Sequence, residues 1–242
     1  NCVPLFVFNG TGSNVVALQL MTRPYHSIFC AETAHIYVDE CGSPVKMTGC
    51  QIHPIATPDG KLTPELMQPY LHGFGDQHHS QPRALYISQC TELGTIYTPE
   101  ELKRLTDFAH LNGMYVHMDG ARIANACAAL NLSLKELTVD CGVDILSFGG
   151  TKNGLMMGEG VIVFNKDLQP EARFIRKQSA QLASKMRYLS CQFTAYLTDD
   201  LWLKNASHAN AMAAKLRAEL EKLPEVTFTQ KAESNQLFLI LP

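Results

Sequence analysis

Residues 98–122 read TPEELKRLTDFAHLNGMYVHMDGAR, and this stretch decides the fold class. Apolar residues recur in it at helical spacing, at Leu102, Leu105 and Ala109. Thr98 is a good capping residue, a proline suits the first turn, and Gly113 suits the end, so residues 98–112 are predicted to form a helix. The apolar run at residues 114–119 follows at once and is typical of a buried strand, onto which the helix is expected to pack.

The same alternation of short apolar runs and longer helical patterns continues on both sides of this stretch. It predicts an α/β protein in which helices connect the strands of a mostly parallel sheet. Strands are predicted at residues 5–8, 27–30, 84–89, 114–119, 145–148 and 160–164. Helices are predicted at residues 13–21, 63–71, 98–112 and 123–130.

The C-terminal part of the chain has a different sequence pattern. A long helical pattern rich in Ala, Leu and Lys covers residues 191–223, and two further strands are predicted at residues 226–229 and 236–241. We therefore predict a large domain at residues 1–200 and the start of a smaller α+β domain at residues 201–242. Because the chain begins at Asn1 and stops directly after a predicted strand, we expect both ends to continue in the parent protein.

The composition is that of an ordinary globular protein, with 46% hydrophobic and 18% charged residues, which excludes intrinsic disorder. The 20 Lys and Arg residues are outnumbered by 23 Asp and Glu residues, so the basic excess of a nucleic-acid-binding protein is missing. The longest apolar runs are strand-sized and fall short of the roughly 18–20 residues that a membrane-spanning helix needs. We therefore expect neither nucleic acid nor a membrane as partner.

Eight cysteines are scattered along the chain without a CxxC pair, and we predict that they are reduced and mostly buried thiols. A cytosol-like compartment follows from this usage. The adjacent His78 and His79 lie in the polar segment of residues 73–81. Adjacent side chains point apart on most backbones, so we predict a solvated loop there and no metal site.

A Gly-rich turn, Phe8-Asn9-Gly10-Thr11-Gly12-Ser13-Asn14, joins the first predicted strand to the first predicted helix. Free backbone amides, the positive end of the helix and a threonine hydroxyl make such a turn a good anion site, with phosphate as the natural guest. A tight connection without a ligand is the alternative interpretation. The turn matches neither GxxxxGK[ST] nor GxGxxG, which disfavours a P-loop fold.

Two further candidate groups stand at strand ends, where α/β sheets bind their ligands. Asp119 ends the predicted strand at residues 114–119, and Arg122 follows three residues later with a planar fork of donors. The alternative to a ligand-binding role is that Asp119 caps a helix and Arg122 is an ordinary surface residue. Lys152 lies in the small-residue loop Ser147-Phe148-Gly149-Gly150-Thr151-Lys152-Asn153-Gly154, which makes it a candidate Schiff-base nucleophile, although most lysines are solvated surface groups.

An anion turn, an acid and a lysine at the same sheet edge meet the needs of pyridoxal phosphate. The turn would anchor its phosphate, the carboxylate would keep its ring nitrogen protonated, and the amine would hold its aldehyde as an imine. His35, in Glu32-Thr33-Ala34-His35-Ile36-Tyr37-Val38-Asp39-Glu40-Cys41-Gly42, has a flat side chain that could stack on the ring and move protons, although a lone histidine is more often structural.

The order and the residues of these motifs resemble those of the β-eliminating lyase and low-specificity threonine aldolase family of fold-type I pyridoxal-phosphate enzymes. The resemblance is carried by FNGTGSNVVAL, AHIYVDECGSP, HMDGARIANA and SFGGTKNG and runs from about residue 5 to residue 241. It implies an aspartate-aminotransferase-like large domain followed by part of a smaller C-terminal domain. It also implies that the family's N-terminal segment and a further carboxylate-binding arginine lie outside this chain.

The resemblance assigns catalytic and cofactor-binding roles to residues of these motifs. It makes Lys152 the imine-forming lysine, Asp119 the partner of the ring nitrogen, and His35 the group stacked on the ring. Gly10 and Thr11 are expected at the phosphate.

Further roles follow from the resemblance at the edges of the expected site. Thr151 is expected at the cofactor, and Arg122 at the cofactor or the substrate carboxylate. Lys177 and Arg187, in RKQSAQLASKMR, resemble a basic pair that reaches the phosphate, with a longer spacing than in the aldolase pattern. Glu92 stands where threonine aldolases usually carry a histidine near the substrate side chain, so it is a candidate substrate contact.

The resulting prediction is a pyridoxal-phosphate-dependent carbon–carbon lyase that cleaves β-hydroxy amino acids such as L-threonine or L-allo-threonine to glycine and an aldehyde. The hydroxyl proton would go to His35, to a water or to Glu92. A β-eliminating lyase or racemase acting on another amino acid is the nearest alternative, and a non-catalytic α/β binding domain is the distant one. The resemblance implies a homodimer or homotetramer, and the cysteine usage predicts a cytoplasmic location.

Overall fold

The computed structural model describes residues 1–241, and Pro242, the last residue of the predicted second domain, lies outside the described residues. Seven strands form one sheet in the order β1-β7-β6-β5-β4-β2-β3. These strands are β1 (Val3–Val7), β2 (His26–Ala31), β3 (Gln51–Ile55), β4 (Gln81–Ser88), β5 (Tyr115–Gly120), β6 (Ile145–Gly149) and β7 (Glu159–Val163). Strands β6, β5, β4, β2 and β3 run parallel, whereas β7 is antiparallel to both of its neighbours, so the prediction of a mostly parallel sheet is confirmed.

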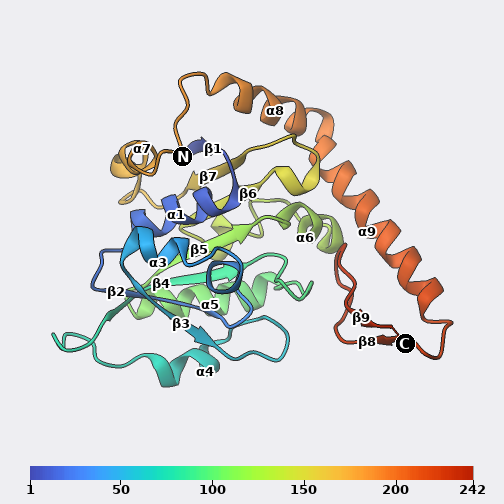
Figure 1. The fold of residues 1–242 in the computed structure, drawn as a ribbon, viewed down its shortest axis with the longest axis horizontal. Coiled ribbons are helices and arrows are strands. Elements are labelled where there is room, and N and C mark those ends of the chain that lie inside the picture. Colours follow the sequence, from blue (N-terminus) through green and yellow to red (C-terminus); the bar gives the residue numbers. More distant parts are fainter. Residues whose placement is uncertain (242) are drawn as a thin grey trace.

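Helices cover both faces of this sheet, and Figure 1 shows α1 and α3 on one side and α5 on the other. The helices are α1 (Gly10–Met21), α2 (His35–Val38), α3 (Ser43–Thr48), α4 (Pro64–Met67), α5 (Pro99–Leu111), α6 (Ile123–Leu130), α7 (Gln169–Gln178), α8 (Arg187–Leu197) and α9 (Leu201–Leu220). Successive side chains of a strand point to opposite faces. In β4, Leu85 and Ile87 therefore join the core beneath α5, while Ala84 and Tyr86 join the core beneath α1.

Helix α5 forms as the sequence predicts. The Thr98 side chain accepts a hydrogen bond from the Glu101 amide, and the Glu101 side chain accepts one from the Thr98 amide, which completes a capping box. The apolar face is fully buried, and Gly113, at φ 71°, turns the chain into β5. The helix thereby delivers β5, and with it Asp119, to the middle of the sheet.

The C-terminal helical pattern is not one continuous helix, so that prediction is wrong. Helix α8 ends at Leu197 and α9 begins at Leu201, because Asp199 and Asp200 adopt left-handed backbone angles with φ of 50° and 55°. The two strands predicted beyond it are confirmed but shorter, β8 (Thr227–Phe228) and β9 (Leu239–Ile240).

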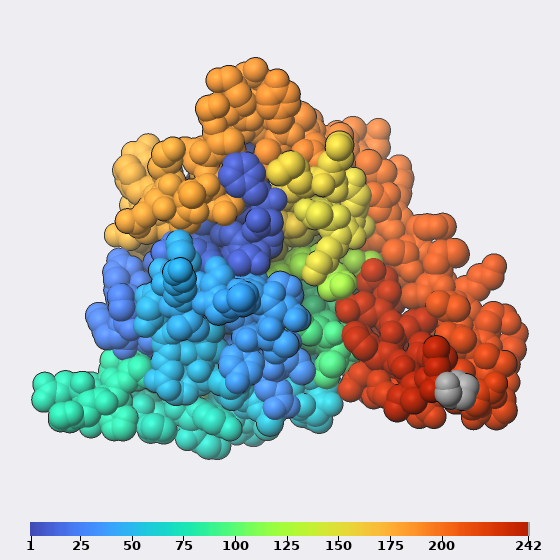
Figure 2. Space-filling model, in the orientation of Figure 1, coloured from blue at the N-terminus to red at the C-terminus, as the bar shows by residue number. Residues whose placement is uncertain are grey.

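Helix α9 runs along one side of the molecule to the small hairpin β8–β9 (Figure 1), and Figure 2 shows these segments gathered on that side. Asn125 of α6 and Asn210 of α9 exchange hydrogen bonds at 3.0 Å. The last helix is therefore tied to the sheet-covering helix α6. The division into two domains at residue 200 stays a prediction.

Helices α2 and α3 and the elements β3 and α7 were not predicted, and the sequences of β3 and α7 show why. Strand β3 contains His53 and Pro54, which break the apolar pattern, yet proline is tolerated because β3 lies at the sheet edge. Helix α7 is dominated by charged and polar residues, and Ala172 is its one fully buried residue.

All eight cysteines are free thiols, and five of them are buried, as predicted. Burial raises the pKa of Cys90 to about 11 and that of Cys127 to about 12. His78 and His79 are exposed in a turn-rich loop, and no group of three or more His, Cys, Asp or Glu side chains within residues 1–241 is arranged to hold a metal ion. None of the helices in residues 1–241 is both long enough and apolar enough to cross a membrane.

Candidate active site

A cavity of about 270 Å³ lies at the carboxyl ends of β5 and β6, beside the start of α1. Four sequence segments far apart in the chain meet there, as expected for a ligand site in an α/β sheet. The wall includes Asn9, Gly10, Thr11, His35, Asp119, Thr151 and Lys152. The structure thus brings together the main residues predicted for the ring, the phosphate and the imine, whereas Arg122, Lys177 and Arg187 do not line this cavity.

The Gly-rich turn is the N-terminus of α1. Asn9 caps the helix, because its side chain accepts a hydrogen bond from the Gly12 amide at 2.7 Å. Gly10 and Thr11 follow in the first turn, where helix amides have no intrahelical partner. A side-chain carbon at Gly10 would have no atom within 4 Å, so the backbone is open to the cavity. This end of α1 is suited to bind an anion such as phosphate.

Asp119 is 8% exposed and lies at the end of β5 among groups that favour its ionised form. Its Oδ2 accepts hydrogen bonds from the Tyr86 hydroxyl at 2.7 Å and from Asn14 Nδ2 at 3.0 Å, and its Oδ1 accepts one from the Ala121 amide at 2.9 Å. Burial alone would raise the pKa of Asp119, but these hydrogen bonds outweigh burial and lower it. The site therefore presents a fixed negative charge to the cavity.

Two polar residues that the sequence analysis did not assign connect Asp119 to His35. Asn14 also donates to Glu40 Oε1 at 2.8 Å, and the same oxygen lies 2.8 Å from His35 Nδ1. The hydrogen bond with Glu40 raises the pKa of His35, against the opposing effect of burial. Both residues stood in quoted motifs. Asn14 lies in the first helix, where a polar residue among apolar ones was the available signal, and Glu40 follows α2 without such a signal.

Lys152 lies in a short 3₁₀ turn, Thr151–Asn153, directly after β6. Its neighbours anchor this turn: Asn153 Nδ2 donates to the Trp202 carbonyl at 2.8 Å, and Asn205 Nδ2 donates to the Asn153 carbonyl at 2.9 Å. Glu159 of β7 accepts a hydrogen bond from the Gly150 amide at 2.7 Å and also lines the cavity. The lysine itself is exposed, so its amine can reach a bound molecule.

The outer residues of the predicted site are not part of the cavity wall. Arg122 stands at the N-cap position of α6 without a side-chain capping bond. Glu92 Oε1 accepts hydrogen bonds from the His35 amide at 2.8 Å and from Ser88 Oγ at 2.6 Å. Burial raises the pKa of Glu92. Lys177 and Arg187 are exposed at the end of α7 and the start of α8, and neither lines the cavity.

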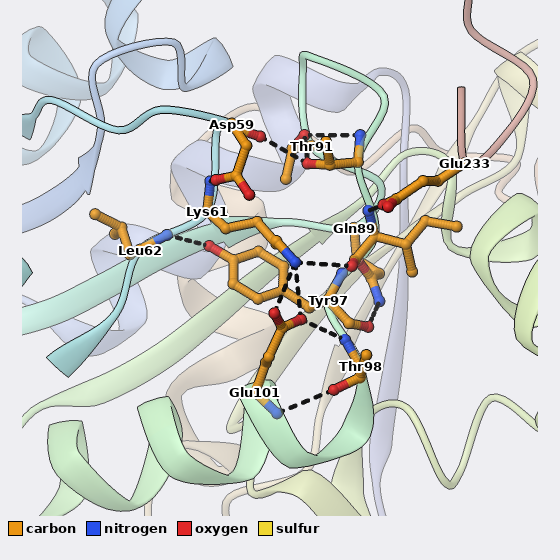
Figure 3. A network of polar contacts seen from close by, with 11 residues as sticks. Asp59, Lys61, Leu62, Gln89, Thr91, Tyr97, Thr98, Glu101 and Glu233 are labelled. Carbon is orange, nitrogen blue, oxygen red and sulfur yellow. Dashed lines mark hydrogen bonds and ion pairs between the residues drawn. The ribbon is translucent and has the colours of Figure 1, made fainter. Parts of the chain in front are cut away.

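The loop that carries Glu92 is braced by a separate polar network, which Figure 3 shows. Lys61 Nζ contacts both carboxylate oxygens of Glu101, at 2.7 and 2.9 Å, and Glu233 accepts a hydrogen bond from the Ile96 amide at 2.8 Å. A hollow of about 310 Å³ adjoins these residues. Lys61 is thus held by Glu101, and the network supports the loop that carries Glu92.

A helix N-terminus, an ionised buried carboxylate and an amine around one cavity form a donor set that fits pyridoxal phosphate. Gly10 and Thr11 suit its phosphate, Asp119 its protonated ring nitrogen, and Lys152 its aldehyde. His35 is the flat side chain on the same wall.

Comparison with known proteins identifies the family and the fold. The family model described as β-eliminating lyase matches residues 3–241. The low specificity L-threonine aldolase of Pseudomonas aeruginosa is 43% identical over 242 residues, which are 100% of this chain and 70% of that protein. The corresponding Pseudomonas sp. protein is 41% identical over 240 residues, which are 99% of this chain and 69% of that protein. The structure of Leishmania major threonine aldolase matches with a TM-score of 0.93 at 33% identity, covering 99% of this chain and 69% of that one.

Proposed function

Because the chain belongs to the β-eliminating lyase family, we propose that it cleaves β-hydroxy amino acids such as L-threonine and L-allo-threonine to glycine and an aldehyde. It is a pyridoxal-phosphate-dependent lyase of the fold-type I class. The observation that carries the proposal is the meeting of Lys152, Asp119 and His35 with the N-terminus of α1 around one cavity.

Four wall residues would hold the cofactor in this proposal. Gly10 and Thr11 bind the phosphate through the first turn of α1, Asp119 keeps the ring nitrogen protonated, and Lys152 supplies the amine that holds the aldehyde. When bound, pyridoxal phosphate withdraws electrons from the α-carbon of the amino acid attached to it. The fixed charge of Asp119 sustains that withdrawal.

Proton removal by a residue of the chain then determines which bond at the α-carbon breaks. His35 accepts the β-hydroxyl proton at Nε2, the Cα–Cβ electron pair stays with the glycine fragment, and the aldehyde departs. A returning proton at Cα completes glycine. We favour His35 over Glu92 as the base, because His35 lines the cavity whereas Glu92 Oε1 accepts its hydrogen bonds from the His35 amide and Ser88. Arg122, just beyond Asp119, is proposed to bind the substrate carboxylate.

Reductive labelling tests the cofactor assignment. The protein with added pyridoxal phosphate should absorb visible light, and borohydride reduction followed by peptide mapping should place the label on Lys152. The Lys152→Ala variant should lose both the label and turnover. A label on another lysine, or turnover in this variant without an added amine, would refute the assignment.

Product analysis tests the reaction. With L-threonine and L-allo-threonine we expect glycine and acetaldehyde in equal amounts. Ammonia with a keto acid would indicate β-elimination, and inversion at Cα would indicate racemisation. A labelled protein that converts none of these amino acids would refute the proposed reaction while leaving the cofactor assignment intact.

We further propose that the protein acts in a cytosol-like compartment as a homodimer or homotetramer. The free state of all eight cysteines supports the compartment. Sedimentation equilibrium would establish the assembly, and a monomer that is fully active would refute it.

A further inference from the structure

Glu40 is a buried carboxylate whose hydrogen bonds all go to residues of the active site. The residue is 5% exposed, and its side chain is completely covered. Oε1 contacts His35 Nδ1 and Asn14 Nδ2, each at 2.8 Å, and Oε2 has no hydrogen-bond partner within residues 1–241. A buried carboxylate is expensive unless its oxygens are paired, so the position is poorly explained by stability alone.

The backbone around Glu40 is shaped to direct this side chain inward. Helix α2 ends at Val38, and Cys41 and Gly42 then adopt left-handed angles in succession, with φ of 50° and 70°. A left-handed angle at a non-glycine residue such as Cys41 is uncommon and costs about 1–2 kcal/mol. Strained residues of this kind cluster at functional sites.

The contact with Glu40 determines what His35 can do. An ionised carboxylate can only accept hydrogen bonds, so the proton of a neutral His35 ring lies on Nδ1. The other nitrogen, Nε2, then carries a lone pair on the side of the ring away from Glu40. A proton taken up at Nε2 makes the ring an imidazolium whose charge stands beside the Glu40 carboxylate.

We propose that Glu40 is a positioning residue that fixes the tautomer and orientation of His35, and that Asn14 ties this pair to Asp119. The proposal rests on the function proposed above, in which His35 serves as the base. Asn14 donates one amide hydrogen to Glu40 and the other to Asp119, so the base and the ring-nitrogen partner are held in one hydrogen-bonded unit.

The other charged groups that face His35 have opposite effects on its pKa. Asp119 of β5 favours its protonated form, Lys152 after β6 disfavours it, and Glu92 contacts only its backbone amide. Glu40 is the one among these that touches the ring. Its removal should therefore change His35 more than the loss of any other single acid.

The direct test is the pKa of His35 in the full chain freed of cofactor, measured by NMR of histidine labelled with ¹⁵N. In Glu40→Gln we expect the pKa of His35 to fall by about one unit or more, since an adjacent opposite charge is lost. Glu40→Asp keeps the charge and should restore part of the shift. Glu32→Gln is the matched control, because Glu32 is an exposed acid of the same segment, and it should leave the pKa of His35 in place.

Turnover supplies the second readout. In Glu40→Gln the acidic limb of the kcat/KM profile should move with the His35 pKa, and kcat should fall by at least about tenfold, as for impaired general-base catalysis. A folded Glu40→Gln protein with an unshifted His35 pKa would overturn the positioning role. Should that variant fail to fold, Glu40→Asp decides the question, because its ring nitrogen signals must still show an Nδ1–H tautomer if the carboxylate sets it. The NMR result stands even if no aldol cleavage is found, so failure of the proposed reaction is distinguishable from failure of this inference.

Discussion

Replacing Tyr86 with Phe isolates one of the contacts that keep Asp119 ionised. Tyr86 is fully buried, and its hydroxyl donates to Asp119 Oδ2 at 2.7 Å. Tyr86→Phe keeps the ring packed beneath α1 and removes the oxygen alone. A hydrogen bond to a charged group contributes about 1.5–3 kcal/mol, so we expect the free energy of unfolding at pH 7 to fall by about that amount.

The loss should depend on pH in a defined direction. The folded pKa of Asp119 is depressed below its ordinary value of 3.8, so the stability that ionised Asp119 contributes is present above about pH 4 and is lost as the pH falls through the folded pKa. The difference in free energy of unfolding between wild type and Tyr86→Phe should therefore be largest at pH 7 and should decrease below about pH 4. In the same variant the pKa of Asp119 should rise by about one to two units, at about 1.36 kcal/mol per unit.

Denaturant unfolding of the cofactor-free wild type and Tyr86→Phe proteins across this pH range measures the difference in their free energies of unfolding. Tyr97→Phe is the matched control, since Tyr97 is also fully buried and its hydroxyl accepts a hydrogen bond from the neutral Leu62 amide at 2.6 Å. The control should lose stability by an amount that does not change between pH 7 and pH 4. The reasoning fails if the Tyr86→Phe difference is absent at pH 7 or is as insensitive to pH as the control.

Three further substitutions test the fold and the site. Gly149→Ala would place a carbon 2.5 Å from the Ala121 carbonyl oxygen, so we expect unfolding measurements to show a loss of about 1–3 kcal/mol or more, and a variant as stable as wild type would contradict the close strand-end packing. Thr98→Ala removes the capping box of α5 and should cost about 0.5–2 kcal/mol in the same assay with kcat unchanged; an altered kcat would contradict a purely structural role. Asp119→Asn should keep the borohydride label on Lys152 but lose most of the turnover, and near-normal turnover would count against the ring-nitrogen role.

The sequence predicted the fold best where local and tertiary preferences agree. Helix α5 has a cap, an apolar face and a terminating glycine, and α6 appears at the predicted residues 123–130. The helix break at Asp199 and Asp200 was missed because any residue except proline can enter a helical pattern, and nothing in the pattern marks these two as left-handed. The antiparallel direction of β7 was also hidden, since an apolar run carries no information about strand direction.

The site was predictable where residues stand at strand ends. Asp119 and Lys152 follow apolar strands, and the rule that ligands bind at the carboxyl edge brings them together without further knowledge. Asn14 and Glu40 are different, because their importance depends on contacts between segments that no spacing reveals. The resemblance also predicted Glu92 as a substrate contact, and this role stays a prediction; in the structure Glu92 Oε1 accepts a hydrogen bond from the His35 amide.

The orientation of Asn14 is determined by groups deeper in the sheet. Burial lowers the pKa of His117 to about 4, so its ring is neutral at physiological pH. Ser147 Oγ donates to Asn14 Oδ1 at 3.1 Å, and it accepts from Ser13 Oγ at 2.7 Å, so the remaining contact, His117 Nε2 at 2.9 Å, must donate as well. With its carbonyl oxygen held in this way, the Asn14 amide nitrogen is left to face both carboxylates. The uncharged layer of His117 and Ser147 therefore sets the direction of the hydrogen bonds that hold Asp119 and Glu40, and it does so from positions that look like ordinary strand core in the sequence.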